Sequence, residues 1–199
     1  MSKESVVFAL AGAFFGLIVG WIIGSQNAAG RQPAPVASVQ APAPQAGASA
    51  EKPPPPFDEE RARALELQAQ RSPSDPAVRA ELGNLFFDGE RYDQAIRWYE
   101  ESLRLDPRNV NVSTDLGVCY YYTNQPDRAL AQFDRSLAID PKHTKTILNV
   151  GIVRAWGKQD LTGAADAWQK VISLAPDSPE ARAARQALES MKAAHPGVS

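Results

Sequence analysis

The side chains in this sequence that could perform chemistry are few and far apart. The chain has two histidines, His143 and His195, and a single cysteine, Cys119. Neither histidine has a second ligand at the spacing of a metal site, and His143 follows Pro141 in a turn, where a solvated polar side chain is expected. We expect Cys119 to be an inert buried thiol, because no neighbouring residue would lower its pKa. The sequence therefore predicts no catalytic residue and no metal ligand.

Motifs that bind cofactors or nucleic acids are also missing. The sequence contains no glycine-rich phosphate loop, no nucleophile elbow and no CxxCH haem-attachment motif. Its 21 basic and 23 acidic residues give a net charge of −2, without a basic block that would suit nucleic acid. The acidic run 58–60 suits the first turn of a helix. We therefore expect a protein that is not an enzyme and that binds neither a cofactor nor nucleic acid.

The dominant pattern is a set of residue types that recurs every 34 residues. The first copy consists of Leu82-Gly83, Ala95, Tyr99 and Pro107, and the second of Leu116-Gly117, Ala129, Phe133 and Pro141. The third copy, with one extra residue in its internal turn, consists of Val150-Gly151, Ala164, Trp168 and Pro176. This period is typical of stacked helix–turn–helix units, each too small to bury its own apolar face. The pattern predicts an all-α solenoid.

Each residue type in the pattern has a physical reason. A glycine inside a helix costs about 1 kcal/mol relative to alanine, so its recurrence indicates that another helix passes very close. The alanine is the small partner on that second helix, and the aromatic residue four positions later lies on the same helix face. The proline ends each second helix, because it cannot continue the hydrogen-bond ladder. An ordinary helical bundle would not need these types at a fixed period.

The pattern also predicts where the helices begin and end. We expect helices at 58–71, 77–89, 92–105, 110–123, 126–139, 144–157, 162–174 and 179–193. Asp75 and Ser178, each followed by proline, are expected N-caps. The domain would span 58–195, with repeats at about 76–109, 110–143 and 144–178 and a capping helix at 179–193. The first helix, at 58–71, is amphipathic, with Ala64, Leu65 and Leu67 among its apolar positions.

The N-terminal part of the chain has a different character. Residues 6–24 carry no charge and have the length that spans a bilayer, so we expect a retained anchor over 1–26. Cleavage near Ala28-Ala29-Gly30 is the alternative. Residues 27–57, rich in proline and alanine, predict a disordered linker. The short N-terminal tail and the long polar region favour a cytoplasmic N-terminus and a periplasmic domain in a bacterial inner membrane.

Four glycines in the predicted anchor recur every four residues. Gly12, Gly16, Gly20 and Gly24 would lie on one stripe of the helix. Such a stripe allows another transmembrane helix to approach closely. It predicts either self-association or docking to a partner helix, although glycine is also common in membrane helices for other reasons.

The repeat closely resembles the tetratricopeptide repeat (TPR) family over residues 76–176. The resemblance implies that the first helix of each unit lines a concave surface that binds a protein partner. Family positions five and two residues before the leucine of the Leu-Gly pair, and two, five and six after it, face that surface. The partner-binding residues implied in this way are Asn84, Phe87, Asn111, Thr114, Val118, Tyr121, Tyr122, Leu148, Ile152 and Trp156.

The charges on this surface argue against one TPR binding mode, in which a partner's C-terminal carboxylate is clamped by lysine, asparagine and arginine. Asn84 and Lys145 match that mode, but Ala80 occupies a lysine position and Asp115 an asparagine position. An aspartate would repel the carboxylate. The remaining surface is apolar and aromatic, which suits an amphipathic helix or an extended peptide. Some of its rings could equally pack inside the domain, and the helix at 58–71 could fold over the groove.

The order of anchor, linker and repeats resembles bacterial membrane proteins that assist the assembly of complexes, including TPR proteins of the cytochrome c maturation group. This resemblance implies a membrane-tethered scaffold or assembly factor that binds a protein partner in its concave groove. The alternative is a structural subunit of a membrane complex that docks through its transmembrane helix. An enzyme has the least support of the three.

Overall fold

The computed structural model describes residues 57–195, and every regular element in this range is helical. The elements are α2 (Glu59–Arg71), α3 (Pro76–Asp88), α4 (Tyr92–Leu105), α5 (Val110–Tyr122), α6 (Pro126–Ile139), α7 (Thr144–Ile152), the π-helix η2 (Val153–Gly157), α8 (Leu161–Leu174) and α9 (Pro179–Ala194). The predicted anchor, its glycine stripe and residues 27–56 of the predicted linker lie outside the described residues. Within residues 57–195, no helix is long and apolar enough to cross a membrane.

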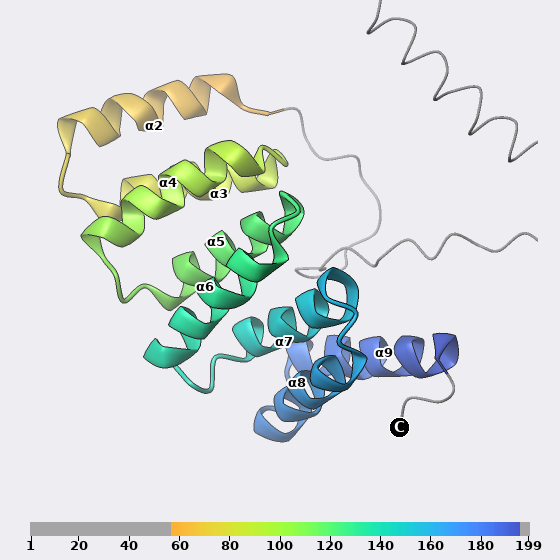
Figure 1. Cartoon of the computed structure of the whole chain (residues 1–199). Coiled ribbons are helices and arrows are strands. Elements are labelled where there is room, and N and C mark those ends of the chain that lie inside the picture. Colours follow the sequence, from red (N-terminus) through yellow and green to blue (C-terminus); the bar gives the residue numbers. More distant parts are fainter. Residues whose placement is uncertain (1–56, 196–199) are drawn as a thin grey trace, which may run out of the picture. The chain divides into compact units, whose positions relative to one another are not determined.

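The helices pack as a series of antiparallel pairs in chain order (Figure 1). α3 packs against α4, α5 against α6, and α7 against α8, and each pair also contacts the next one along the chain. Each observed helix begins and ends within two residues of the range expected from the sequence, when η2 is counted with α7. The 34-residue period therefore corresponds to one helix–turn–helix unit of an all-helical solenoid, as predicted.

A glycine on each first helix lies under a large ring from the second helix of the same unit. The pairs are Gly83 with Tyr99, Gly117 with Phe133, and Gly151 with Trp168. In each pair, a Cβ added to the glycine would come closer than 3.0 Å to ring atoms. The three rings are at most 1% exposed. The recurring glycine is therefore needed for the close approach of the two helices, as the sequence predicts.

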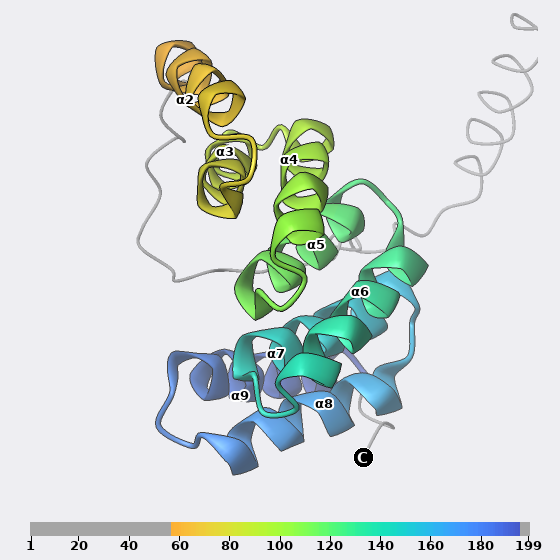
Figure 2. The same cartoon turned by 90° about the vertical axis from the view of Figure 1, so that its left-hand side faces the viewer.

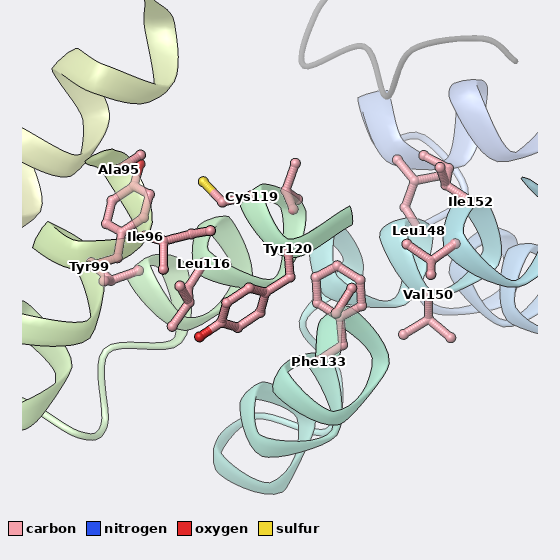
Figure 3. Close-up of a cluster of buried hydrophobic side chains, with 14 of the residues drawn as sticks. Ala95, Ile96, Tyr99, Leu116, Cys119, Tyr120, Phe133, Leu148, Val150 and Ile152 are labelled. Carbon is pink, nitrogen blue, oxygen red and sulfur yellow. The ribbon is translucent and has the colours of Figure 1, made fainter. Parts of the chain in front are cut away.

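The buried side chains of successive units form one connected core. Figure 3 shows part of it, where apolar groups from α4, α5, α6 and α7 follow one another across the unit boundaries. Cys119 on α5 is fully buried in this core, and burial raises the pKa of its thiol. The burial of Cys119 predicted from the sequence is confirmed.

Side-chain caps fix the beginnings of several helices. Asp75 Oδ1 accepts a hydrogen bond of 2.8 Å from the Ala77 amide, and Ser178 Oγ accepts one of 3.0 Å from the Ala181 amide. Both residues precede a proline in the first turn, where the missing N–H has no cost. These two predicted N-caps are confirmed.

The extra residue of the third unit is absorbed at the end of its first helix. In each unit, the turn to the second helix contains one residue with positive φ: Glu90 (57°), Asn124 (59°) and Gln159 (57°). In the third unit the helix widens into η2, where the Lys158 amide donates to the Val153 carbonyl at 3.1 Å. A π-helical turn accommodates one additional residue, so Gln159 reaches the same left-handed position as its counterparts.

The N-terminal end of the stack is closed by α2, which packs against α3 (Figure 2). α2 corresponds to the second helix of an incomplete unit, because Leu65 and Pro73 lie one period before Tyr99 and Pro107. Its buried stripe consists of Ala62, Leu65 and Ala69, whereas Ala64 and Leu67 are exposed. This helix therefore continues the stack and does not fold over the first helices of the later units.

The C-terminal end is closed by α9, which packs against α8 and α7. α9 has the register of a first helix, but Arg185 and Gln186 occupy the positions of Val150 and Gly151, 35 residues later because the third unit has one extra residue. Both side chains are exposed. Because the face that would receive a second helix is polar, α9 ends the array, as expected of a capping helix.

Candidate functional site

The first helices carry the ten residues predicted to bind a partner, and the structure divides these residues by exposure. The buried ones are Thr114, Val118, Leu148 and Ile152. They are buried because α5 packs against α7, and α7 packs against α9. Asn84 and Asn111 are exposed, and the half-buried ones are Phe87, Tyr121, Tyr122 and Trp156. Of the ten, only these last six side chains reach the surface to an extent that would allow contact with a partner.

A row of hydrogen bonds joins α5 to the beginning of α7. His143 Nδ1 lies 2.7 Å from Thr146 Oγ1, and its Nε2 lies 3.2 Å from Asn111 Oδ1. Thr146 Oγ1 in turn lies 2.6 Å from Thr114 Oγ1, in a buried contact. The expectation that His143 is simply solvated was therefore wrong, since its half-buried ring bridges two units. Asn111 and Thr114 are engaged within the domain.

An ion pair continues this row between the same two helices. Lys145 Nζ donates to Asp115 Oδ1 at 2.7 Å, and the Asp115 side chain is only 20% exposed. Lys145 was one of two residues that matched the carboxylate-clamping mode. Because Asp115 neutralises the charge of Lys145, the carboxylate of a bound protein would have to displace the Asp115 carboxylate from Lys145. The structure thus gives a direct reason why this lysine is a poor carboxylate receptor.

The surface-reaching rings gather where the first helices end. The Tyr92 ring stacks on the Tyr122 ring at 4.4 Å between centroids and 9° between planes, and it meets Phe87 edge-on at 5.6 Å. Tyr121 lies 5.9 Å from Tyr122. We call Phe87, Tyr92, Tyr121, Tyr122 and Trp156 the aromatic edge. All five side chains are half-buried and so reach the surface.

Trp156 connects the aromatic edge to the third unit. A Cβ added to the next residue, Gly157, would lie 3.4 Å from Tyr121 Cε2, so the end of η2 lies beside the Tyr121 ring. The Trp156 indole lies 5.5 Å from the buried indole of Trp168, which fixes its base within the core. Residues from all three units therefore lie close together where the first helices end.

The phenol groups of the aromatic edge are available to a partner. The hydroxyls of Tyr92, Tyr121 and Tyr122 make no hydrogen bond to any residue of the part that the structure describes, whereas Tyr99 donates to Asn84 Oδ1 at 2.8 Å. Burial raises the pKa of all three phenols of the edge. They therefore stay neutral at physiological pH and can both donate and accept hydrogen bonds.

Sequence reasoning missed one member of the aromatic edge. Tyr92 is the first residue of α4 and belongs to none of the family positions that face the groove. The tight turn after α3 brings it back beside the last turn of that helix, where it reaches both Phe87 and Tyr122. An aromatic residue directly after such a turn is the signal that could have identified it.

Residues 57–195 show no candidate site for metal binding. In this range, no three histidine, cysteine, aspartate or glutamate side chains are close enough together to hold a metal ion. His195 is exposed and follows the end of α9. The aromatic edge is therefore the best candidate for a functional site in the described part of the chain.

These features define a helical-repeat protein with half-buried aromatic side chains at the ends of its first helices. Two family models match the sequence, one described as "TPR repeat" over residues 83–124 and one described as "Tetratricopeptide repeat" over residues 112–143. Residues 83–143 therefore contain tetratricopeptide repeats, as the 34-residue period predicted. A comparison with curated protein sequences found no match.

Three solved structures illustrate the shared fold. MamA 41-end from Desulfovibrio magneticus RS-1 is 23% identical, with 68% of this chain and 75% of that chain covered and a TM-score of 0.61. The first TPR domain of human RPAP3 is 27% identical. The match covers 60% of this chain and 97% of that chain, with a TM-score of 0.51. The third structure is the second TPR domain of human RPAP3 in complex with the HSP70 peptide SGPTIEEVD, which is 21% identical. The match covers 59% of this chain and 98% of that chain, with a TM-score of 0.52.

Proposed function

We propose that this protein is an interaction module that holds an amphipathic helix or an extended segment of a partner protein against the aromatic edge. The observation that carries the proposal is the aromatic edge itself, with half-buried rings from three units and three hydroxyls unpaired within residues 57–195. Aromatic side chains of this kind dominate the binding energy of protein interfaces. The peptide complex of an RPAP3 domain supports peptide binding as a use of this fold.

The packing beneath the aromatic edge supports a preformed binding surface. The Tyr92–Tyr122 stack and the Trp156–Trp168 contact hold the rings in place before a partner arrives. The bonds of His143 and the Lys145–Asp115 ion pair hold α5 against α7. A surface that is ordered in advance loses less conformational entropy on binding.

The partner segment is proposed to bind through its apolar side chains and not through its C-terminal carboxylate. We therefore expect no binding of the peptide SGPTIEEVD, because Asp115 both repels the carboxylate and neutralises Lys145. Fluorescence polarisation with the labelled peptide measures this, and the second TPR domain of human RPAP3 is the positive control. Saturable binding that is lost in a Lys145→Ala variant would contradict the expectation.

We also propose that residues 6–24 anchor the chain in a bacterial inner membrane, with a cytoplasmic N-terminus and a periplasmic TPR domain. The absence of charge in this segment and the long polar region after it support the proposal. Protease added to spheroplasts should then degrade the TPR domain, and the mature protein should begin near Met1 or Ser2. A domain that is protected until the inner membrane is lysed would overturn the orientation.

A structural subunit of a membrane complex, docked through the glycine stripe, is the second candidate function. Purification of the full chain in mild detergent, followed by mass spectrometry, separates the two candidates if two variants are compared. A partner held by the aromatic edge should be lost in Tyr121→Ala/Trp156→Ala and kept in Gly16→Leu/Gly20→Leu. The reverse result would favour the structural subunit. A role beside the cytochrome c maturation group stays a prediction.

A further inference from the structure

A second recessed surface lies at the N-terminal end of the stack. An open cavity of about 410 Å³ lies between α2, α3 and α4. Ala69, Pro73 and the indole of Trp98 give it apolar walls, and the carboxylates of Glu66 and Glu101 also line it. None of its lining residues belongs to the aromatic edge, so it is a separate place on the molecule.

Arg79 also lines this cavity, but its N–H groups already donate hydrogen bonds within the domain. Its Nη1 donates to the carbonyls of Ser72 (3.2 Å) and Asp75 (2.9 Å), and its Nη2 to the carbonyl of Ala69 (3.5 Å). Its Nε donates to Glu101 at 3.3 Å. A guanidinium has five N–H donors, and at least four of these bind the turn between α2 and α3 or a carboxylate. Arg79 therefore ties the helices together and does not make the cavity an anion site.

One carboxylate of the cavity lining is not neutralised by an ion pair within residues 57–195. Glu101 is shared between Arg79 and Arg104, the latter at 3.9 Å. Glu66 makes no ion pair with any residue of the described range 57–195. Glu101 is therefore paired with two guanidiniums, and Glu66 is the lining carboxylate that has no ion-pair partner within the described range. An apolar wall beside an uncompensated carboxylate suits a ligand with an alkyl stem and a cationic end.

The corresponding place in the next unit is filled by hydrogen-bonded side chains. The residues one period after Trp98, Glu101 and Arg79 are Gln132, Arg135 and Ser113. Gln132 Nε2 donates to Ser113 Oγ at 2.7 Å, and Arg135 Nη1 donates to Gln132 Oε1 at 3.2 Å. The indole of Trp98 and the carboxylate of Glu101 are thus particular to the N-terminal end, whereas Glu66 has an acidic counterpart, Glu100, one period later.

We propose that this cavity binds the side chain of a lysine or arginine from a partner polypeptide, as a second contact in addition to the aromatic edge. The alkyl stem lies against Ala69 and Pro73, and the cationic head lies between the Trp98 indole and the Glu66 carboxylate. The indole attracts a cation through its quadrupole, and long basic side chains bury their stems while the charged end stays near water. Bound partner chains would then extend from the aromatic edge past α2.

The test uses the indole N–H signals of the full-length protein in detergent micelles, recorded by NMR. The Trp98 signal is identified by its loss in Trp98→Phe. Titration with Nα-acetyl-lysine methylamide should shift this signal in a saturable manner. Nα-acetyl-norleucine methylamide has a similar stem without the charge, and it should bind at least about threefold more weakly.

Two variants complete the test. Glu66→Gln should weaken binding of the lysine probe about threefold, whereas Glu180→Gln, on α9 at the other end of the stack, should leave it unchanged. Both residues lie on helix surfaces, so both variants should keep the helical signal. A Trp98 signal that does not shift, equal binding of the two probes, or an unchanged affinity in Glu66→Gln would each overturn the proposal. These results do not depend on the aromatic edge, so that proposal stands or falls separately.

Discussion

We expect the Gly117→Ala variant to be less stable than the natural protein by about 2–3 kcal/mol, in spite of alanine's better helix propensity. The Cβ of alanine would come closer than 3.0 Å to ring atoms of Phe133, whose ring is fully buried. A rigid ring between two helices cannot move aside as the end of a flexible side chain can. The helices must therefore separate. Thermal unfolding of the full chain, followed by circular dichroism, measures the loss.

The control for this prediction is a smaller side chain at the opposing position. In a Phe133→Leu background, the same Gly117→Ala change should cost much less, because leucine can adjust to the new methyl group. The two changes are then coupled, as expected for residues in direct contact. An equal cost in both backgrounds would show that close approach to the ring is not the reason for the glycine.

The second large effect concerns binding. Replacing Tyr121 and Trp156 with alanine should weaken partner binding by about 30-fold or more, because hot-spot aromatic residues contribute about 2 kcal/mol or more. The two rings come from adjacent units and are both half-buried, so each presents a face that a partner can cover. Affinity of the variant for a purified partner, measured by titration calorimetry, gives the size of the loss.

A matched control separates this effect from a general loss of apolar surface. Leu105→Ala/Leu174→Ala removes two large apolar side chains that are 41% and 37% exposed, at the ends of α4 and α8. This control should bind the partner normally. Because Trp156 touches Trp168, the aromatic variant should melt somewhat earlier but retain its helical signal. Unchanged affinity in the folded aromatic variant would place the binding site elsewhere.

The features that the sequence predicted correctly depend on contacts within one unit. The Gly117–Phe133 contact recurs at a fixed period, and such repetition identifies the fold and the helix positions. The N-caps at Asp75 and Ser178 are equally local, because a cap depends on residues within one turn. Local geometry of this kind is visible in a single sequence.

The features that the sequence did not predict depend on contacts between units. The burial of Thr114 and Leu148 follows from the packing of α5, α7 and α9, and the period alone does not specify how tightly these helices pack. His143 bonds to side chains on two helices for the same reason. The membership of Tyr92 in the aromatic edge depends on how the turn after α3 folds back.

Site-specific photocrosslinking in cells tests the central claim most directly. The crosslinking residue p-benzoylphenylalanine, placed at Tyr121 in the full chain, should give a discrete product with one protein. The same residue placed at Asp134, an exposed position on α6, should not. Adding Trp156→Ala to the Tyr121 chain should remove the product, because the partner no longer rests on the aromatic edge. A product that forms equally from position 134, or that survives the loss of Trp156, would contradict a partner site on this surface.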